Sequence, residues 1–446
     1  MRTLPTLLAL ACTLAALNPP AAAQGPMGLS LKQALDLAAR QSYAVQNSEL
    51  AAAKARARVK EVLAIGLPQV EVTGGLNNYI DVPTSVVPNF FGGEPEFLEV
   101  QFGVPWTVTG AAQLSQLLFD GSYLVGLEAT RELKTQSEQE LEKARADAMA
   151  QAAKAYLGAL AAREGARLAA ESVPVLEKSL REAEGMVQVG FLENTDTDRL
   201  AIALASARDR ARSFAQQEKV ALAYLRLVLG LAAETPLDLT DDLRTIVDDT
   251  DEKNLVTRAI DLNTHIDHQL ANTLVRLQTM DVRNQKAAYM PKLYGFLSHQ
   301  RQSFGTDGPI ETDWFPATLW GVNLTVPIWS SGMRGNRVKQ ANITLDQTRV
   351  NLKATEQRLL AEAEERTEKA LAAEESYRSE LASLDLAKRI FDRTSIKFTN
   401  GLASSFELNQ DQGQYLQAQQ LYVQRLAELL MARADLRRRL SPNTAA

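Results

Sequence analysis

The sequence contains few of the residues that build disulfides and metal sites. Its 446 residues include one cysteine, Cys12, and three histidines. A disulfide needs two sulfurs, and thiolate zinc or iron-sulfur sites need several Cys ligands. A disulfide scaffold and a thiolate metal centre are therefore excluded, and we expect no metal and no cofactor.

Positive charge and catalytic motifs are also scarce. Lys and Arg number 48 against 54 Asp and Glu, which gives a formal net charge of −6 and no basic surface for a phosphate backbone. The sequence has no glycine-rich phosphate loop, nucleophile elbow or metalloprotease helix. We expect neither a nucleic-acid partner nor enzymatic activity.

Two groups of polar residues could suggest a catalytic or metal site. His265 and His268 are three residues apart without a third ligand, and we interpret them as an exposed helix face. The acidic residues between the two halves of the chain have no histidine nearby, and we interpret them as a solvated loop. They are Asp241, Asp242, Asp248, Asp249, Asp251 and Glu252.

The N-terminal segment has the pattern of an export signal. Arg2 precedes a short apolar run, and small residues stand before Gln24, so we expect a signal peptide over residues 1–23. The alternative, a lipid-modified Cys12, lacks the leucine expected three residues upstream. No later run of about 18 apolar residues could form a transmembrane helix, so any membrane insertion must use strands.

The mature chain repeats one plan twice. Each half has a helical stretch, a Pro-marked entry into a sheet-like segment, a turn with Gly, and two long helical stretches. We predict a first repeat over 24–230, a linker or equatorial region over 231–254, a second repeat over 255–441 and a C-terminal tail over 442–446.

The helical stretches are unusually long. Residues 336–400 contain no glycine or proline and are rich in strong helix formers, as are residues 191–229, and a third stretch follows Gly413 to Leu440. At about 1.5 Å per residue the first stretch would extend on the order of 100 Å. The spacing of apolar residues fits both a coiled-coil rod and a curved wall of helices.

Two segments alternate like strands that cross a bilayer. Residues 101–109 and 319–328 place apolar side chains on one face and small or polar ones on the other, over the length that a tilted strand needs. Their expected partners are 69–76 and 292–300. All four tryptophans of the chain fall in or beside these segments, as expected for aromatic residues at a membrane interface: Trp106, Trp314, Trp320 and Trp329.

Four strands leave unpaired edges in lipid. Each unpaired backbone group there costs several kcal/mol, so the strands must close into a barrel with those of other copies. The sequence therefore predicts a homo-oligomer if the strands enter the membrane.

The ordered set of motifs resembles the TolC-like outer membrane efflux protein family over nearly the whole mature chain. Leu67-Pro68 and Met290-Pro291 stand at strand entry, and Leu118-Phe119-Asp120-Gly121 stands at strand exit. The corresponding exit motif of the second repeat ends at Gly332 and lacks the Asp. The helix-helix turns have the four-residue motifs Val189-Gly190-Phe191-Leu192 and Asn400-Gly401-Leu402-Ala403.

The resemblance implies a mainly helical fold with a small β part and a homotrimer. Long helices would form a periplasmic α-barrel, and four strands per chain would contribute to a 12-stranded transmembrane β-barrel. The protein would then lie in the outer membrane of a Gram-negative bacterium, in contact with outer membrane lipid. It would be the exit duct of a tripartite efflux or type I secretion system. A periplasmic coiled-coil structural or adaptor protein is the alternative.

The resemblance also implies partners and site residues. The partners would be a periplasmic adaptor (membrane fusion) protein and an inner membrane pump of the RND or ABC type. Glu407 and Asp411 would form an acidic ring at the periplasmic gate. The residues expected to contact the adaptor lie at the two turns: Gly190, Phe191, Leu192, Gly401, Leu402 and Ala403.

Overall fold

The computed structural model describes residues 27–90, 92–248 and 260–439. The expected signal peptide and C-terminal tail lie outside these residues. The chain forms two compact units, which we call the helical unit (residues up to 46, 144–261 and from 360 on) and the sheet unit (47–143 and 262–359). Two long helices, α3 (Gly121–Gln188) and α8 (Met333–Thr399), contribute residues to both units.

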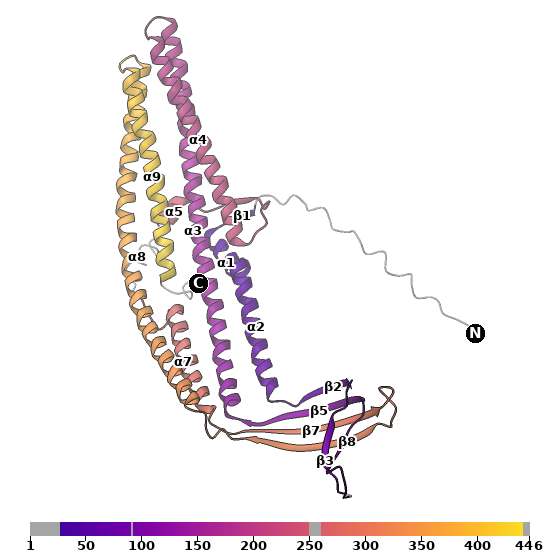
Figure 1. Cartoon of the computed structure of the whole chain (residues 1–446). Helices are drawn as coiled ribbons and strands as arrows, with labels where there is room; N and C mark the ends of the chain where they lie inside the picture. The colour runs from indigo at the N-terminus through magenta and orange to yellow at the C-terminus, as the bar shows by residue number, and fades with distance from the viewer. Residues whose placement is uncertain (1–26, 91, 249–259, 440–446) are drawn as a thin grey trace, which may run out of the picture. The chain divides into compact units, whose positions relative to one another are not determined.

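The sheet unit contains a four-stranded antiparallel sheet (Figure 1). Its strands follow the order β2-β5-β7-β8, so β2 and β8 are the edge strands. Strands β2 and β5 come from the first half of the chain, and β7 and β8 come from the second half. The pairing of β5 with β7 joins the two halves. The bounds are β2 Gln69–Asn78, β5 Trp106–Asp120, β7 Lys292–Gly305 and β8 Phe315–Thr325.

The strand register gives this sheet one apolar face. Cross-strand partners share a face, and the pairs Leu76↔Val108, Val70↔Leu114 and Leu297↔Trp320 all lie on the same side. The opposite face carries mostly polar residues, among them Glu71, Thr107, Thr109, Gln113, Ser298 and Asn323. We call the first side the apolar face of the sheet.

Helices lead directly into the first strand of each hairpin. Helix α2 (Tyr43–Ile65) precedes β2, and α7 (Ile266–Ala287) precedes β7. Helix α7 packs on α8 through Val282, Ala341 and Leu345. Among the described residues, no helix combines the length and apolar character required to cross a bilayer.

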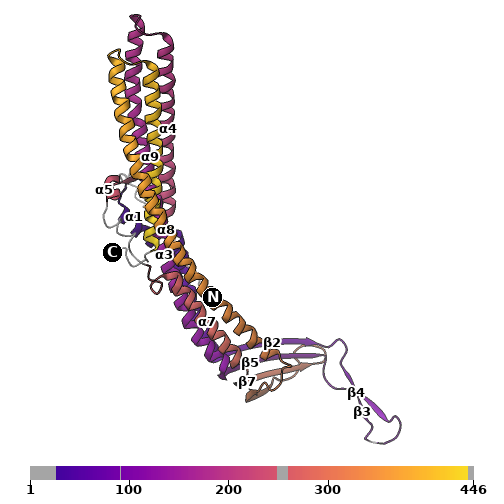
Figure 2. The same cartoon turned by 90° about the vertical axis from the view of Figure 1, so that its left-hand side faces the viewer.

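The helical unit is built from two helical hairpins, which run alongside each other in both views (Figures 1 and 2). One consists of α3 and α4 (Asn194–Leu229), the other of α8 and α9 (Ser405–Arg439). Their apolar stripes meet in a buried cluster, which we call the tip cluster. Its members are Ala183, Leu200, Phe391, Phe398, Leu408 and Tyr415.

Short elements at the other end of the helical unit tie the start of the chain to residues 237–248. Strand β1 (Met27–Leu29) pairs in parallel with β6 (Leu237–Leu239), and α1 (Leu31–Gln41) follows directly. Ser30 caps α1 in a reciprocal capping box with Gln33. A short helix, α5 (Leu243–Asp248), follows β6, so the expected linker region contains regular structure.

The predicted limits of two strands, 101–109 and 319–328, were wrong. The expected strand over 101–109 is interrupted, because β4 (Phe97–Gln101) ends and β5 begins only at Trp106. Gly103 has a φ of 132° and Pro105 has no N–H for a ladder. Strand β8 ends at Thr325 rather than Ile328, since Pro327 likewise lacks a donor. The hairpin that pairs β3 (Thr84–Pro88) with β4 was not expected.

Candidate functional site

The two helix-helix turns at the end of the helical unit share one backbone geometry. Gly190 and Gly401 have φ values of 78° and 71°, a left-handed conformation that glycine adopts without strain. Phe191 N–H donates to Met186 O at 2.9 Å, and Leu402 N–H donates to Lys397 O at 2.8 Å. Both turns are therefore Schellman motifs, which end α3 and α8 in the same way.

The residues after the two glycines differ in exposure. Phe191 is 82% exposed and Leu402 is 78% exposed. Leu192 and Ala403 instead pack against the tip cluster, so they stabilise the turns from inside. Two further apolar side chains near the turns are exposed, Val189 and Phe406, and neither was among the residues expected to contact the adaptor.

The two residues expected at the gate lie on the first turns of α9. Glu407 is exposed and forms a capping box with Ser404: its carboxylate accepts from Ser404 N–H at 3.3 Å, and its own N–H donates to Ser404 Oγ at 3.2 Å. Asp411, one turn further, accepts a hydrogen bond from Thr394 Oγ1 of α8 at 2.6 Å. Asp411 is therefore held against its own hairpin, whereas the Glu407 side chain faces solvent.

Side-chain hydrogen bonds join the two hairpins beside the turns. Ser405 Oγ donates to Asp196 Oδ1 across α9 and α4, and Thr399 Oγ1 donates to Glu182 Oε2 at 2.9 Å across α8 and α3. Neither pair could be predicted from the sequence, because residues more than 200 positions apart give no local signal. Together with the tip cluster, they fix the two turns side by side.

The structure places three of the strand-boundary motifs directly at strand ends. Pro68 and Pro291 each stand one residue before a strand, β2 and β7. Asp120 is the last residue of β5, and its carboxylate accepts from Ser122 N–H at 2.8 Å and lies 3.0 Å from Lys292 Nζ. It thus caps α3 at its N-terminus and pairs with the neighbouring strand.

Two glycines stand at the starts of the long helices. A Cβ on Gly121, the first residue of α3, would lie 2.5 Å from Met290 Sδ, so a larger residue there would require the Met290 side chain to move. Gly332, which precedes α8, has a φ of 80°.

Three of the four tryptophans lie near the ends of the sheet. Trp106 begins β5, Trp314 precedes β8, and Trp329 follows β8 on the side of the helices. Trp320 lies within β8 opposite Leu297 and is 76% exposed on the apolar face.

The structure corrects two interpretations of polar residues. Asp241 is not part of a solvated loop: its carboxylate accepts from Leu31 N–H at 2.6 Å and from the Tyr156 hydroxyl at 2.9 Å. Asp249, Asp251 and Glu252 lie outside the described residues. His265 and His268 are buried rather than exposed.

The burial of the two histidines has a physical cause, the packing of α7. His265 Nδ1 accepts the N–H of Asp267 at the start of the helix. His268 Nε2 lies 3.2 Å from Glu356 Oε1 of α8. In the part of the chain that the structure describes, no three His, Cys, Asp or Glu residues are grouped so that they could hold a metal ion.

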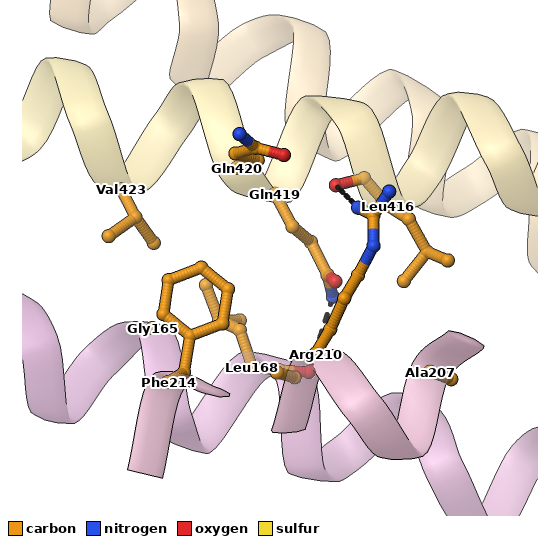
Figure 3. Close-up of a pocket in the computed structure, with 10 residues that line it drawn as sticks. Gly165, Leu168, Ala207, Arg210, Phe214, Leu416, Gln419, Gln420 and Val423 are labelled. Carbon is orange, nitrogen blue, oxygen red and sulfur yellow. Dashed lines mark hydrogen bonds between the residues drawn. The ribbon is translucent and has the colours of Figure 1, made fainter. Parts of the chain in front are cut away.

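A small cavity lies where α3, α4 and α9 meet (Figure 3). Arg210 of α4 donates to Leu416 O, and Gln419 of α9 donates to Leu168 O, both at 3.3 Å. Gly165 leaves room for the ring of Phe214, whose Cδ1 would lie 2.8 Å from an added Cβ. Arg210 and Gln419, two of the polar residues that line the cavity, are thus used in hydrogen bonds between the helices.

Comparison with protein families gives one clear match. The profile described as outer membrane efflux protein matches residues 34–231 and 266–441, which is most of the chain. Comparison of the sequence with curated proteins gives no significant match.

Solved structures share the fold at low sequence identity. The CmeC outer membrane channel of Campylobacter jejuni has a TM-score of 0.68 and 16% identity, over 92% of this chain and 85% of that one. The outer membrane protein VceC of Vibrio cholerae has a TM-score of 0.67 and 14% identity, over 92% and 96%. The open-state MtrE outer membrane channel of Neisseria gonorrhoeae has a TM-score of 0.66 and 15% identity, over 92% and 88%.

Proposed function

The chain belongs to the outer membrane efflux protein family, and from this premise we propose that three copies form the exit duct of a tripartite efflux or type I secretion system. The duct would carry small molecules or polypeptides passively across the periplasm and the outer membrane. It performs no chemistry of its own, in keeping with membership of a family of channel proteins.

The observation that carries this proposal is the open sheet with one apolar face. Strands β2 and β8 each have a free backbone edge. In hydrocarbon such an edge costs several kcal/mol per unpaired group, and pairing β2 of one copy with β8 of the next removes both edges. The apolar face would then contact lipid and the polar face would line a wet lumen.

The helical unit supplies the periplasmic end of this proposal. Phe191 and Leu402 present apolar side chains at the two turns, which suits contact with an adaptor protein that connects the duct to an inner membrane pump. Glu407 from three copies would line the narrow end. The three-copy ring, the adaptor and the pump are expectations carried from the family.

The domain organisation is proposed on the same basis. A duplicated unit explains why the two Schellman turns share one geometry and why Pro68 and Pro291 occupy equivalent positions before their strands. Removal of residues 1–23 as a signal peptide would deliver the mature chain to the periplasm.

A pair of neighbouring substitutions in β8 tests membrane insertion. Val322 lies on the apolar face and Asn323 on the other face. A lysine on the lipid side costs about 2–4 kcal/mol near the bilayer midplane, whereas a lumen position tolerates it. We expect Val322→Lys to abolish recovery of oligomer from the outer membrane fraction, and Asn323→Lys to be recovered normally.

Two results would contradict the proposal. One is an unaltered distribution of Val322→Lys between the membrane and soluble fractions. The other is a wild-type protein that needs no detergent for extraction. Either would favour a soluble periplasmic scaffold.

A further inference from the structure

The apolar face of the sheet carries two titratable side chains, both on β7. Register places His299 and Arg301 on the same side as Leu297, Val108 and Trp320. Every other residue that the four strands place on this face is uncharged, and the carboxylates of Glu71 and Asp120 belong to the opposite side. Lys292 and Arg301 are the only Lys or Arg residues in the four strands.

The surroundings of Arg301 leave its side chain accessible. Its cross-strand partners are Gly110 on β5 and Pro316 on β8, and Gly74 lies beyond Gly110 on β2. A Cβ added at either glycine would meet no atom within 4 Å, so no side chain covers the sheet next to Arg301 on this side. Arg301 is exposed and has no hydrogen bond or ion pair with any residue that the structure describes.

His299 stands two residues away and is partly oriented. Its Nδ1 lies 2.8 Å from Thr318 Oγ1 of β8, and the side chain is exposed. When Nδ1 accepts from the Thr318 hydroxyl, Nε2–H on the far edge of the ring is left to donate to a second partner. In that tautomer the two side chains offer donors on one stretch of otherwise apolar surface.

A cation in this place needs an anion from outside the chain. The cost of Arg on a lipid-facing strand is large at the bilayer midplane and nearly vanishes at the interfaces. Arg301 lies in the half of β7 that is remote from the helices. On β7 it stands between the residue that pairs with Trp320 of β8 and the residue that pairs with Trp106 of β5. A long side chain there can reach the headgroup level.

Phosphate fits this site better than a protein carboxylate. A guanidinium binds phosphate oxygens through two parallel hydrogen bonds. A second chain that pairs with the free edges of β2 or β8 leaves β7 uncovered, because β7 lies between β5 and β8. We propose, on the premise of the outer membrane barrel proposed above, that Arg301 and His299 bind the phosphate of an anionic membrane lipid on the outside of the barrel.

Lipid retention by the purified full-length oligomer tests the site. The protein is delipidated in neutral detergent, offered mixed vesicles of phosphatidylglycerol and phosphatidylcholine, re-extracted and examined by native mass spectrometry. We expect phosphatidylglycerol to be retained over phosphatidylcholine by about fivefold, the preference expected of one basic side chain at an anionic surface. Arg301→Gln should lose this preference and Arg301→Lys should keep most of it.

Control variants separate the site from general charge effects. Arg337→Gln removes one exposed positive charge from α8, outside the strands, and should retain phosphatidylglycerol like the wild type. His299→Asn should weaken the preference without abolishing it. An equal preference in wild type and Arg301→Gln, or an equal loss in Arg337→Gln, overturns the proposal.

Inorganic phosphate distinguishes the source of the anion. Retention that persists in millimolar inorganic phosphate supports a lipid ligand, whereas displacement by inorganic phosphate overturns it in favour of the free ion. Failure of the wild-type protein to enter membranes would refute the proposed exit duct instead, and fractionation detects that before any lipid is added.

Discussion

At the scale of single residues, three helix-ending glycines share a backbone conformation but not an environment. Gly190 and Gly401 have open space around an added Cβ, whereas at Gly230, with φ 69°, the Cβ would lie 2.4 Å from Gln41 O. We expect Gly190→Ala and Gly401→Ala each to lower the free energy of unfolding by about 1 kcal/mol, the cost of a left-handed alanine. Gly230→Ala should cost clearly more, because the Gln41 backbone must also move.

Denaturant unfolding of the three variants checks this order. Gly190→Ala and Gly401→Ala serve as controls for the backbone conformation alone. If the loss of unfolding free energy in Gly230→Ala were no larger than in Gly190→Ala, the Gln41 backbone would move without a cost.

A second residue-scale prediction concerns the charge of Glu407. Glutamine can replace glutamate in the capping box with Ser404, so Glu407→Gln removes the charge and keeps the cap. If three copies of Glu407 ring the narrow end, their field attracts cations. We expect Glu407→Gln to reduce cation selectivity and block by multivalent cations in single-channel recordings.

Salt and a neighbouring variant sharpen that measurement. The effect should be clearest at about 0.01 M salt, where the Debye length is roughly 30 Å. Asp411→Asn is the comparison, because Asp411 is already engaged by Thr394 of its own hairpin. Unchanged selectivity in Glu407→Gln together with a change in Asp411→Asn would move the ring one turn along α9.

At the scale of elements, one buried hydroxyl links the start of the chain to α3. Tyr156 is fully buried and donates toward Leu29 O and Asp241 Oδ2, each at 2.9 Å. Burial first, and then the Asp241 carboxylate, raise the pKa of Tyr156 above its ordinary value of 10.0. The fold therefore favours the neutral phenol, and this stabilisation is complete below pH 10 and is lost as the pH rises above it.

Comparison with Tyr156→Phe isolates this effect. The variant should be less stable than wild type at pH 7 by about 2 kcal/mol, the value of a hydrogen bond to a charged group. From pH 10 upward only the wild type must retain a proton on this hydroxyl, so the difference in unfolding free energy should shrink. A constant difference up to pH 11 would contradict the assignment.

The limits of the helices could be predicted from the sequence more closely than those of the strands. Three of the long helices, α4, α8 and α9, were predicted from composition, and α8 runs over 333–399 against an expected 336–400. Propensity accumulates along such a stretch, so a few unfavourable residues do not change the outcome. Gly413 even lies inside α9, because packing of Leu408 and Tyr415 in the tip cluster outweighs the cost of one glycine.

Strands and side-chain partners were harder to predict for physical reasons. Alternation marks a face but not an end, and a single proline such as Pro105 or Pro327 ends pairing within an unbroken pattern. Contacts such as that of Ser405 with Asp196 join residues that are remote in sequence. The positions of the two turns were predictable, whereas the inward packing of Leu192 and Ala403 was not.

At the scale of the whole molecule, the open sheet bears on the number of copies in the proposed duct. Each chain offers four strands in one sheet with two free edges. One chain cannot close these edges, and two chains would give a barrel of about eight strands, whose interior is just filled by side chains. In the proposed barrel, three chains would give the smallest ring with room for water and cargo, and for this reason we expect a trimer.

We therefore expect the detergent-extracted protein to have about three times the mass of the mature chain, measured by light scattering with the detergent contribution subtracted. Closure of the proposed barrel would make the strands of all three copies interdependent, since losing one copy would reopen two edges in an apolar environment. Dissociation on heating should then proceed from trimer to monomer without a populated dimer, whereas a soluble helical rod would come apart independently of its strands. A stable monomer in mild detergent, or a dimer that conducts ions, would contradict this architecture, because neither provides a closed ring with a wet lumen.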